Sequence, residues 1–139
     1  MREILFRGKT HDGEWRESST VFIRGELAIM LNERPIKELI KDENGKLVDV
    51  IFSFCAVEKN TVGQFTGLTD MNSKKIFEGD IMPVWKNGEK YLYKVVYFGD
   101  CFMLSMIDSE QGSYPLSIKH NISKVVGNIH DNPELLKGV

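Results

Sequence analysis

The fold of this chain is decided by residues 61–82, which read TVGQFTGLTDMNSKKIFEGDIM. Glycines, turn residues and apolar residues follow one another closely in this segment, with little room for variation. A tight hairpin is expected at Asn72-Ser73, and a strand is expected to begin at Asp80. The segment therefore predicts the connection between an irregular, charged N-terminal half and a regular, β-rich C-terminal half.

The C-terminal half carries short apolar segments at intervals of about ten residues, which favours a small barrel. Turns at Asn87-Gly88 and Gly99-Asp100 separate the first of these segments. The region over residues 77–129 has the length and turn pattern of an SH3-like barrel. A loop over residues 108–113 and a closing helical turn after Asn132 are also expected. The predicted strands are Asp80–Trp85, Lys90–Phe98, Cys101–Ile107, Tyr114–Ile118 and Ile122–His130.

The N-terminal half begins with two expected hairpins. Asp12-Gly13 and Arg24-Gly25 are turn signals between short apolar segments. The expected hairpins pair Ile4–Gly8 with Glu14–Glu17, and Val21–Ile23 with Leu27–Leu31. This half is expected to form a β layer on the barrel, or an arm that reaches over a neighbouring subunit.

Residues 32–57 are harder to assign. The residues Ile36, Leu39 and Ile40 recur at helical spacing after Pro35, so a short helical turn is favoured over a strand or a loose arm. Asn44-Gly45 is a strong turn signal. The segment from Leu47 to Val57 is almost continuously apolar and rich in β-branched residues, which predicts a buried strand.

The composition describes an ordinary globular chain of 139 residues, with 18 basic and 20 acidic residues and a formal net charge of −2. This length favours one domain over residues 1–139, with a subdivision into 1–60 and 61–139. Neither half has the basic excess that drives strong nucleic-acid binding. Cys55 and Cys101 are both set among apolar residues, and we expect two reduced, buried thiols.

No motif for a cofactor or for catalysis stands out. The residues His11, His120 and His130 are scattered, without metal-ligand spacing to another His or Cys. The N-terminal residues lack the long apolar core of a signal peptide, and no apolar run approaches the ~20 residues that span a bilayer. We therefore expect a soluble, intracellular protein without a cofactor, a metal site or a membrane partner.

Three segments of the chain together resemble the YopX-like family of phage and prophage proteins. The resemblance spans the chain and is weakest over residues 8–57. It rests on Met1–Ile4 with Phe6-Arg7, on Thr61–Leu68 with Asp70, Lys74, Ile76 and Glu78–Ile81, and on Val126–Ile129 with Asn132–Leu136. It implies a mainly β fold, a phage or prophage origin and the cytoplasm of a bacterial host. It implies no established activity and supplies no catalytic residues.

Two departures from this family pattern are visible. Asn72-Ser73 stands where the family usually has Asn-Gly, and because Ser tolerates positive φ poorly, the turn is of another type or carries some strain. Met82-Pro83 follows Ile81, where Val is common. Pro83 removes a ladder donor, so its strand is expected to lie at an edge or a bulge there.

Three acidic residues of the central segment, Asp70, Glu78 and Asp80, form a candidate acidic loop beside Gly67 and Gly79. Paired carboxylates can bind a divalent metal or serve in acid–base chemistry, which makes a metal-dependent hydrolase one alternative function. The favoured interpretation is structural. In it the glycines set backbone angles, and the aspartates cap turns through the backbone.

Aromatic and basic residues alternate in the predicted barrel. The candidate nucleic-acid face consists of Trp85, Lys90, Tyr91, Tyr93 and Lys94. An aromatic face with lysines can stack the bases of single-stranded nucleic acid. The competing interpretation is that the aromatic residues fill a small core or a subunit interface.

The sparse N-terminal half offers Trp15 and Phe22 as a candidate protein interface. Its hydrophobic segments exceed what a small barrel can cover, which predicts a homo-oligomer or a protein partner. The preferred function is a non-enzymatic accessory protein that self-assembles or binds another protein. Weak binding of single-stranded nucleic acid is the first alternative.

Overall fold

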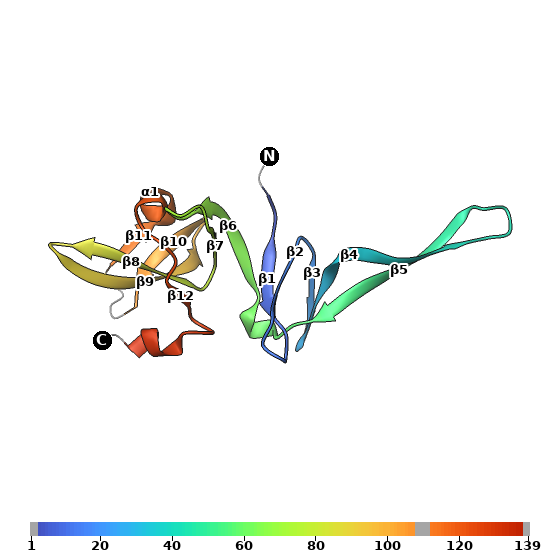
Figure 1. Cartoon of the computed structure of the whole chain (residues 1–139), viewed down its shortest axis with the longest axis horizontal. Coiled ribbons are helices and arrows are strands. Elements are labelled where there is room, and N and C mark those ends of the chain that lie inside the picture. The colour runs from blue at the N-terminus through green and yellow to red at the C-terminus, as the bar shows by residue number, and fades with distance from the viewer. Residues whose placement is uncertain (1–2, 108–111, 138–139) are drawn as a thin grey trace. The chain divides into compact units, whose positions relative to one another are not determined.

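A computed structural model describes residues 3–107 and 112–137 of the chain. The loop expected over residues 108–113 therefore lies largely outside the described residues, as do residues 1–2. The chain divides into an N-terminal unit, Leu5–Val62, and a C-terminal unit that starts at Gly63 and takes in Glu3 and Ile4. The fold is mainly β with only short helical turns, as the sequence predicted (Figure 1).

The elements of each unit follow one another with short connections. The N-terminal unit contains β1 (Phe6–Lys9), β2 (Trp15–Ser18), β3 (Val21–Arg24), β4 (Leu27–Lys41), β5 (Leu47–Ala56) and the 3-10 turn η1 (Lys59–Thr61). The C-terminal unit contains β6 (Gly63–Thr69), β7 (Lys75–Phe77), β8 (Asp80–Lys86), β9 (Glu89–Phe98), β10 (Cys101–Met106), β11 (Ser113–Pro115), α1 (Leu116–Lys119), η2 (His120–Ile122), β12 (Gly127–Asn128) and η3 (Pro133–Lys137).

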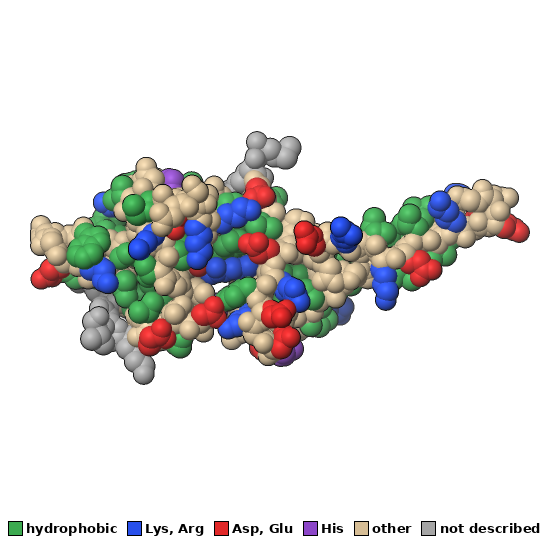
Figure 2. All heavy atoms as spheres, in the orientation of Figure 1, with side chains coloured by type: hydrophobic (Ala, Val, Ile, Leu, Met, Phe, Trp, Pro, Cys, Tyr) green, Lys and Arg blue, Asp and Glu red, His purple; other side chains and the backbone are tan. Residues whose placement is uncertain are grey.

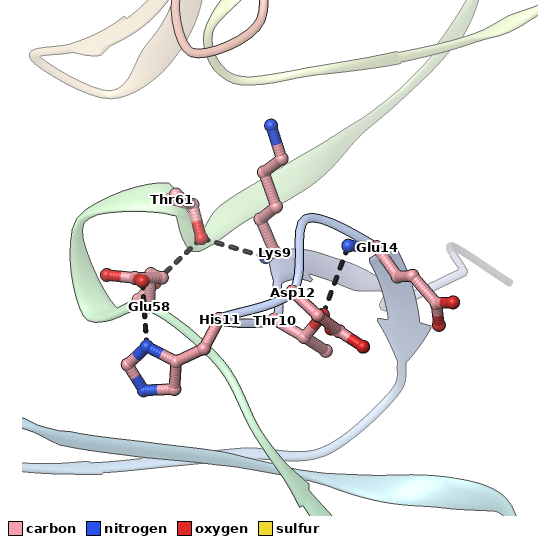
Figure 3. Close-up of polar contacts among 7 residues, drawn as sticks. All are labelled: Lys9, Thr10, His11, Asp12, Glu14, Glu58 and Thr61. Atoms are coloured by element: carbon pink, nitrogen blue, oxygen red, sulfur yellow. Dashed lines mark hydrogen bonds and ion pairs between the residues drawn. The ribbon is translucent and has the colours of Figure 1, made fainter.

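The two hairpins expected in the N-terminal unit are confirmed. Strand β1 pairs antiparallel with β2, and β3 pairs antiparallel with β4. The core between them is small and consists of Ala28, Met30 and Val57. Polar contacts add to it: Thr61 Oγ1 accepts a hydrogen bond from the Lys9 N–H at 2.8 Å and donates to the Glu58 carbonyl at 2.7 Å (Figure 3). These contacts fasten η1 to the end of β1.

The helical turn expected over residues 32–41 is wrong. These residues belong to strand β4, which pairs with β5 from Ile29↔Ala56 to Lys41↔Leu47. The helical spacing of Ile36, Leu39 and Ile40 comes instead from irregularities in the register, because bulges shift which residues share a face. Pairing with a strand distant in sequence overrides the weak local preference.

The segment from Leu47 is a strand, as predicted, but the expectation that it is buried is wrong. Most side chains of β5 are exposed. Strand β5 lies at the end of the three-stranded order β3-β4-β5, and β4 is its neighbour. Its apolar side chains therefore lie next to β4 within the sheet. In the described residues, no second layer covers them along most of the strand.

The C-terminal unit contains an antiparallel sheet of order β11-β10-β9-β8-β12. The turn between β8 and β9 has Asn87 at φ 51° and Gly88 at φ 81°, as expected for Asn-Gly in a two-residue hairpin. Strand β12 pairs with β8 at Asp80 and Ile81. At Pro83, β8 pairs with β9 on one side, and no other described strand pairs with it on the other side. The edge position expected for Pro83 is confirmed. The described pairings make an open sheet, and the SH3-like detail stays a prediction.

Two strands predicted near the C-terminus are much shorter than expected. Strand β11 ends at Pro115, and the next residues form α1, because a proline ends the ladder and begins a helix well. Of the strand expected from Ile122 to His130, two residues pair as β12. Other backbone groups of this segment bond to single backbone atoms, such as the Val126 N–H to the Ile81 carbonyl at 2.9 Å, or to a side chain: Asp70 accepts from the Val125 N–H at 2.9 Å. The closing turn η3 is confirmed.

The core of the C-terminal unit lies on one face of this sheet and includes Ile76 of β7. It contains Ile76, Met82, Val84, Tyr93, Val95, Phe102, Leu104 and Leu116. The alternation predicted for β9 is confirmed, since Tyr93 and Val95 point into this core. The expectation of two buried thiols is wrong, because Cys55 is half-buried and Cys101 is exposed. The short turn after Gly99 places Cys101 at the first position of β10, where the side chain faces away from the core.

Candidate functional site: the β4–β5 arm

Residues 31–54, which we call the arm, form a two-stranded ribbon that extends from the rest of the N-terminal unit (Figure 1). Strand β4 is 15 residues long and β5 is 10 residues long. The turn between them is held by Asp42, whose carboxylate accepts hydrogen bonds from the backbone N–H groups of Asn44 and Lys46 at 2.9 and 3.0 Å. The arm is therefore a hairpin with a well-closed turn.

One face of the arm is apolar. The register pairs Leu31 with Phe54, Ile36 with Phe52 and Leu39 with Val50, and directly paired residues share a face. We call these six residues the apolar stripe. Among them Ile36 is 56% exposed, Leu39 49%, Phe52 45% and Phe54 49%. Apolar side chains are visible along the upper side of the arm in Figure 2.

The opposite face of the arm is mixed. The register pairs Glu38 with Ile51 and Ile40 with Asp49. Near the base, the Asn32 side-chain amide donates to Ser53 Oγ. Carboxylates and an amide on this face are compatible with water, whereas the apolar stripe is not. One face of the ribbon is therefore apolar and the other is mixed, as in an antiparallel strand pair that is covered on one side.

Strand β4 of the arm is an irregular strand that carries a proline. Pro35 lacks an N–H, and the register shifts between Leu31 and Ile36, between Ile36 and Glu38 and between Ile40 and Lys41. Proline and bulges are the devices that protect edge strands from association. Pairing of a further strand along β4 is therefore not expected.

An isolated two-stranded ribbon is at best marginally stable in water. Each large apolar side chain of the stripe would gain about 1 kcal/mol if its exposed half were covered, given about 1.5–3 kcal/mol for complete burial. The stripe is exposed on the N-terminal unit, and the described residues of that unit do not cover it. The arm is the strongest candidate for a functional surface in the described residues.

A cleft of about 970 Å³ lies at the base of the arm, within the N-terminal unit. Trp15 lines this cleft together with Leu31, Pro35 and Cys55. The Arg7 guanidinium lies over the Trp15 ring at 4.8 Å from its centroid, which holds the indole in place. The other residue of the predicted interface, Phe22, lies on β3 and is exposed, outside the lining of this cleft.

The three residues of the candidate acidic loop act on nearby backbone groups. Asp70 accepts from the N–H groups of Asn72, Lys74 and Val125 at 2.8, 3.0 and 2.9 Å. Glu78 accepts from the Gln64 N–H at 2.9 Å, and Asp80 accepts from the Phe77 N–H at 2.8 Å. Each carboxylate caps its own turn or strand end, which agrees with the structural interpretation.

The pKa of Asp70 reflects these contacts. Burial alone raises the pKa of this carboxyl, but hydrogen bonds from the backbone N–H groups of Val125, Lys74 and Asn72 outweigh burial. The net effect holds the pKa of Asp70 below its ordinary value. A carboxylate that is already committed to three N–H donors is a poor metal ligand. In the described part of the chain, no three His, Cys, Asp or Glu side chains gather as metal ligands.

The candidate nucleic-acid residues are divided between the two faces of the sheet. Tyr93 is fully buried, and Tyr91 packs against the same core. The register pairs Trp85 with Lys90 and Ile81 with Lys94, which places Trp85, Lys90 and Lys94 on the opposite, outer face. The structure therefore brings together three of the five residues, with Trp85 65% exposed.

The chain belongs to the YopX protein family, which matches residues 6–137. Among solved structures, it is similar to the crystal structure of protein EF1440 from Enterococcus faecalis, with 25% sequence identity and a TM-score of 0.59. The similarity covers 98% of this chain and 99% of that chain. None of the curated proteins compared with the chain matches it. No helix in residues 3–107 and 112–137 is long and apolar enough to cross a membrane.

Sequence reasoning missed the apolar stripe. A usable signal was present, because Asn44-Gly45 is a hairpin turn signal with apolar residues on both sides of it. The helical assignment of residues 32–41 concealed this pattern. The exposure of the stripe had no sequence signal, since an apolar strand reads the same whether it is covered or not.

Proposed function

We propose that this YopX-family protein acts by self-association through the arm, as a non-enzymatic accessory protein of a phage or prophage. The observation that carries the proposal is an apolar stripe exposed on one face of a two-stranded ribbon. Water-exposed apolar patches of this kind mark interaction surfaces. The family membership supports the phage setting.

A second copy of the chain is the partner that fits the stripe best. In a two-fold contact the same patch meets itself, and an apolar stripe is complementary to an apolar stripe. The charges of the arm nearly cancel, with acidic Glu33, Glu38, Asp42, Glu43 and Asp49 and basic Arg34, Lys37, Lys41 and Lys46. Each arm therefore carries a net charge of only −1, and the repulsion between two arms is small.

Sedimentation equilibrium between 1 and 100 μM tests the proposal. We expect a mass of twice 15.9 kDa at the upper concentrations. The double variant Leu39→Ser with Phe52→Ser removes two stripe residues, and we expect its dimer dissociation constant to rise at least tenfold, which corresponds to about 1.4 kcal/mol.

The matched control is Ile51→Ser, on the opposite face of the same strand. This variant should associate as the wild type does, and circular dichroism should show the same strand content in all three proteins. A wild-type protein that stays at 15.9 kDa up to 100 μM would overturn the proposal. If Ile51→Ser lost association equally, the loss in the double variant would come from a less stable arm. That result would also contradict self-association through the apolar stripe.

Binding of single-stranded nucleic acid is a second candidate, carried by the outer face of the C-terminal sheet. Trp85, Lys90 and Lys94 share that face, and the strand positions of β8, β9 and β10 on it carry no carboxylate. An exposed indole with two ammonium groups can stack a base and contact phosphates. Fluorescence anisotropy of a labelled oligonucleotide at low and moderate salt tests it, and Trp85→Ala should weaken the binding. Binding that is absent at low salt excludes this function.

A further inference from the structure

Two lysines meet around one phenol in the C-terminal unit. Lys86 of β8 has its Nζ 4.8 Å from the centroid of the Tyr114 ring and 5.7 Å from that of Tyr93. Lys119 of α1 has its Nζ 4.9 Å from the centroid of the Tyr114 ring. Strands β8 and β11 are separated by two strands in the sheet order, so the sheet curves to bring these groups together.

The positive charge of this pair is uncompensated in the described residues. Both lysines are half-buried, and neither has a carboxylate within ion-pair distance in residues 3–107 and 112–137. The neighbouring carboxylate, Glu89, accepts a hydrogen bond from the Tyr91 hydroxyl at 2.6 Å. Lysines that are withdrawn from water are normally paired with a carboxylate, so two such ammonium groups around one ring favour an anion.

A buried phenol beside these lysines also favours an anion. The Tyr93 side chain is fully buried, and its hydroxyl has no hydrogen-bond partner in the described part of the chain. Its ring lies against the Tyr114 ring, with centroids 5.7 Å apart. A buried donor without an acceptor costs about 1–3 kcal/mol. This independent observation indicates that an acceptor belongs near these rings.

The protonation states suit an anion site. The Tyr114 phenol, and next the Tyr93 phenol, hold the pKa of Lys86 above its ordinary value. In return, contact with Lys86 lowers the pKa of Tyr114. Lys86 therefore stays charged at every physiological pH, and Tyr114 is a stronger hydrogen-bond donor than an ordinary phenol.

We propose that Lys86, Lys119 and Tyr114 form a binding site for a phosphate-type oxyanion. Two ammonium groups match the charge of a phosphate, for which lysine acts as a point-charge ligand. The phenol of Tyr114, whose ring both lysines contact, is a further donor. The phosphate belongs either to a free phosphate compound or to a nucleic-acid backbone, and the site is separate from the arm.

Heteronuclear NMR of the full chain with inorganic phosphate, at ionic strength held constant with chloride, tests this site. We expect saturable shifts of the Tyr114 ring signals. Lys86→Met and Lys119→Met should each weaken binding about tenfold or more, as expected for losing a hydrogen bond to a charged group. Lys94→Met on the outer face is the matched control and should bind as the wild type. Lys86→Arg keeps the charge and should retain binding if Lys86→Met fails to fold.

A parallel titration uses a short oligonucleotide without terminal phosphates. Shifts at Tyr114 that depend on Lys86 and Lys119 with phosphate alone assign a free phosphate compound. The same dependence with the oligonucleotide alone assigns the nucleic-acid backbone. Shifts that do not saturate, or that are the same in Lys86→Met and in the wild type, overturn the proposal.

Discussion

Asp70 accepts a hydrogen bond from the backbone N–H of Val125, 55 residues further along the chain, with the two atoms 2.9 Å apart. Its other carboxylate oxygen accepts from the N–H groups of Asn72 and Lys74. Asp70 thus fixes the turn before β7 and the approach to β12 at once. We expect Asp70→Asn to lower the free energy of unfolding by about 1–3 kcal/mol, because an amide nitrogen cannot accept from Val125. Urea unfolding at pH 7 measures this change.

The same residue sets a pH dependence. The pKa of Asp70 is lower in the folded protein than the ordinary value near 3.8. The stability that this carboxylate contributes is therefore complete above that ordinary value and is lost as the pH falls through the folded pKa. Urea unfolding between pH 5 and pH 2.5 should show a smaller acid-dependent loss in Asp70→Asn than in the wild type. Identical slopes in the two proteins would refute the assignment.

Ser73 occupies a backbone conformation that favours glycine. Its φ is 65°, and its N–H donates to the Asp70 carbonyl at 2.9 Å. For an L-residue, this backbone conformation costs about 1–2 kcal/mol. Replacement by glycine removes that cost, but part of the gain is lost because glycine makes the unfolded chain freer. We expect Ser73→Gly to raise the free energy of unfolding by about 0.5–1 kcal/mol in a urea titration. Asn87→Gly is the comparison, since Asn tolerates its φ of 51° and should gain little. A loss of stability in Ser73→Gly would contradict the assigned turn.

Gly63 has no room for a side chain. A Cβ at this position would lie 2.9 Å from the backbone oxygen of Glu78 and 3.3 Å from its Cβ. Gly63→Ala must separate β6 from the chain beside β7, and we expect a loss of about 1–3 kcal/mol in the free energy of unfolding. Thr69→Ala, at the exposed end of β6, should change stability by less than about 0.5 kcal/mol. Chemical denaturation measures the free energy of unfolding of both variants. Equal changes in Gly63→Ala and Thr69→Ala would show that strand β6 tolerates the added methyl group.

The sequence was most informative where local chemistry has one solution. The Asn87-Gly88 turn, the Asp12-Gly13 turn and the alternation of Tyr93 with Leu92 were predicted because positive φ and period-2 burial leave few alternatives. It was least informative around Pro35 and Val125. There the backbone groups are satisfied by partners distant in sequence, a strand in one case and the Asp70 carboxylate in the other. A local pattern carries no trace of such partners.

The candidate sites divide in the same way. The caps formed by Asp70 and Asp80 were anticipated from turn chemistry, whereas the contact of Glu78 with the Gln64 N–H was not. Tyr93 and Trp85 could not be separated from sequence, because aromatic residues on adjacent strands alternate between two faces that differ only in what covers them. The meeting of Lys86 with Tyr114 depends on the curvature of the sheet, which no residue pattern specifies.

By itself, the sequence determined a mainly β chain, its hairpin turns, and a central segment from Thr61 to Met82 that identifies the family. Those features depend on backbone angles and on the spacing of neighbouring residues, which a sequence records directly. Only the tertiary structure decided that residues 31–54 form an arm with an exposed apolar stripe, and that two lysines converge on one phenol. Exposure and convergence are properties of which surfaces meet in space, and they are set by pairings between residues far apart in the chain.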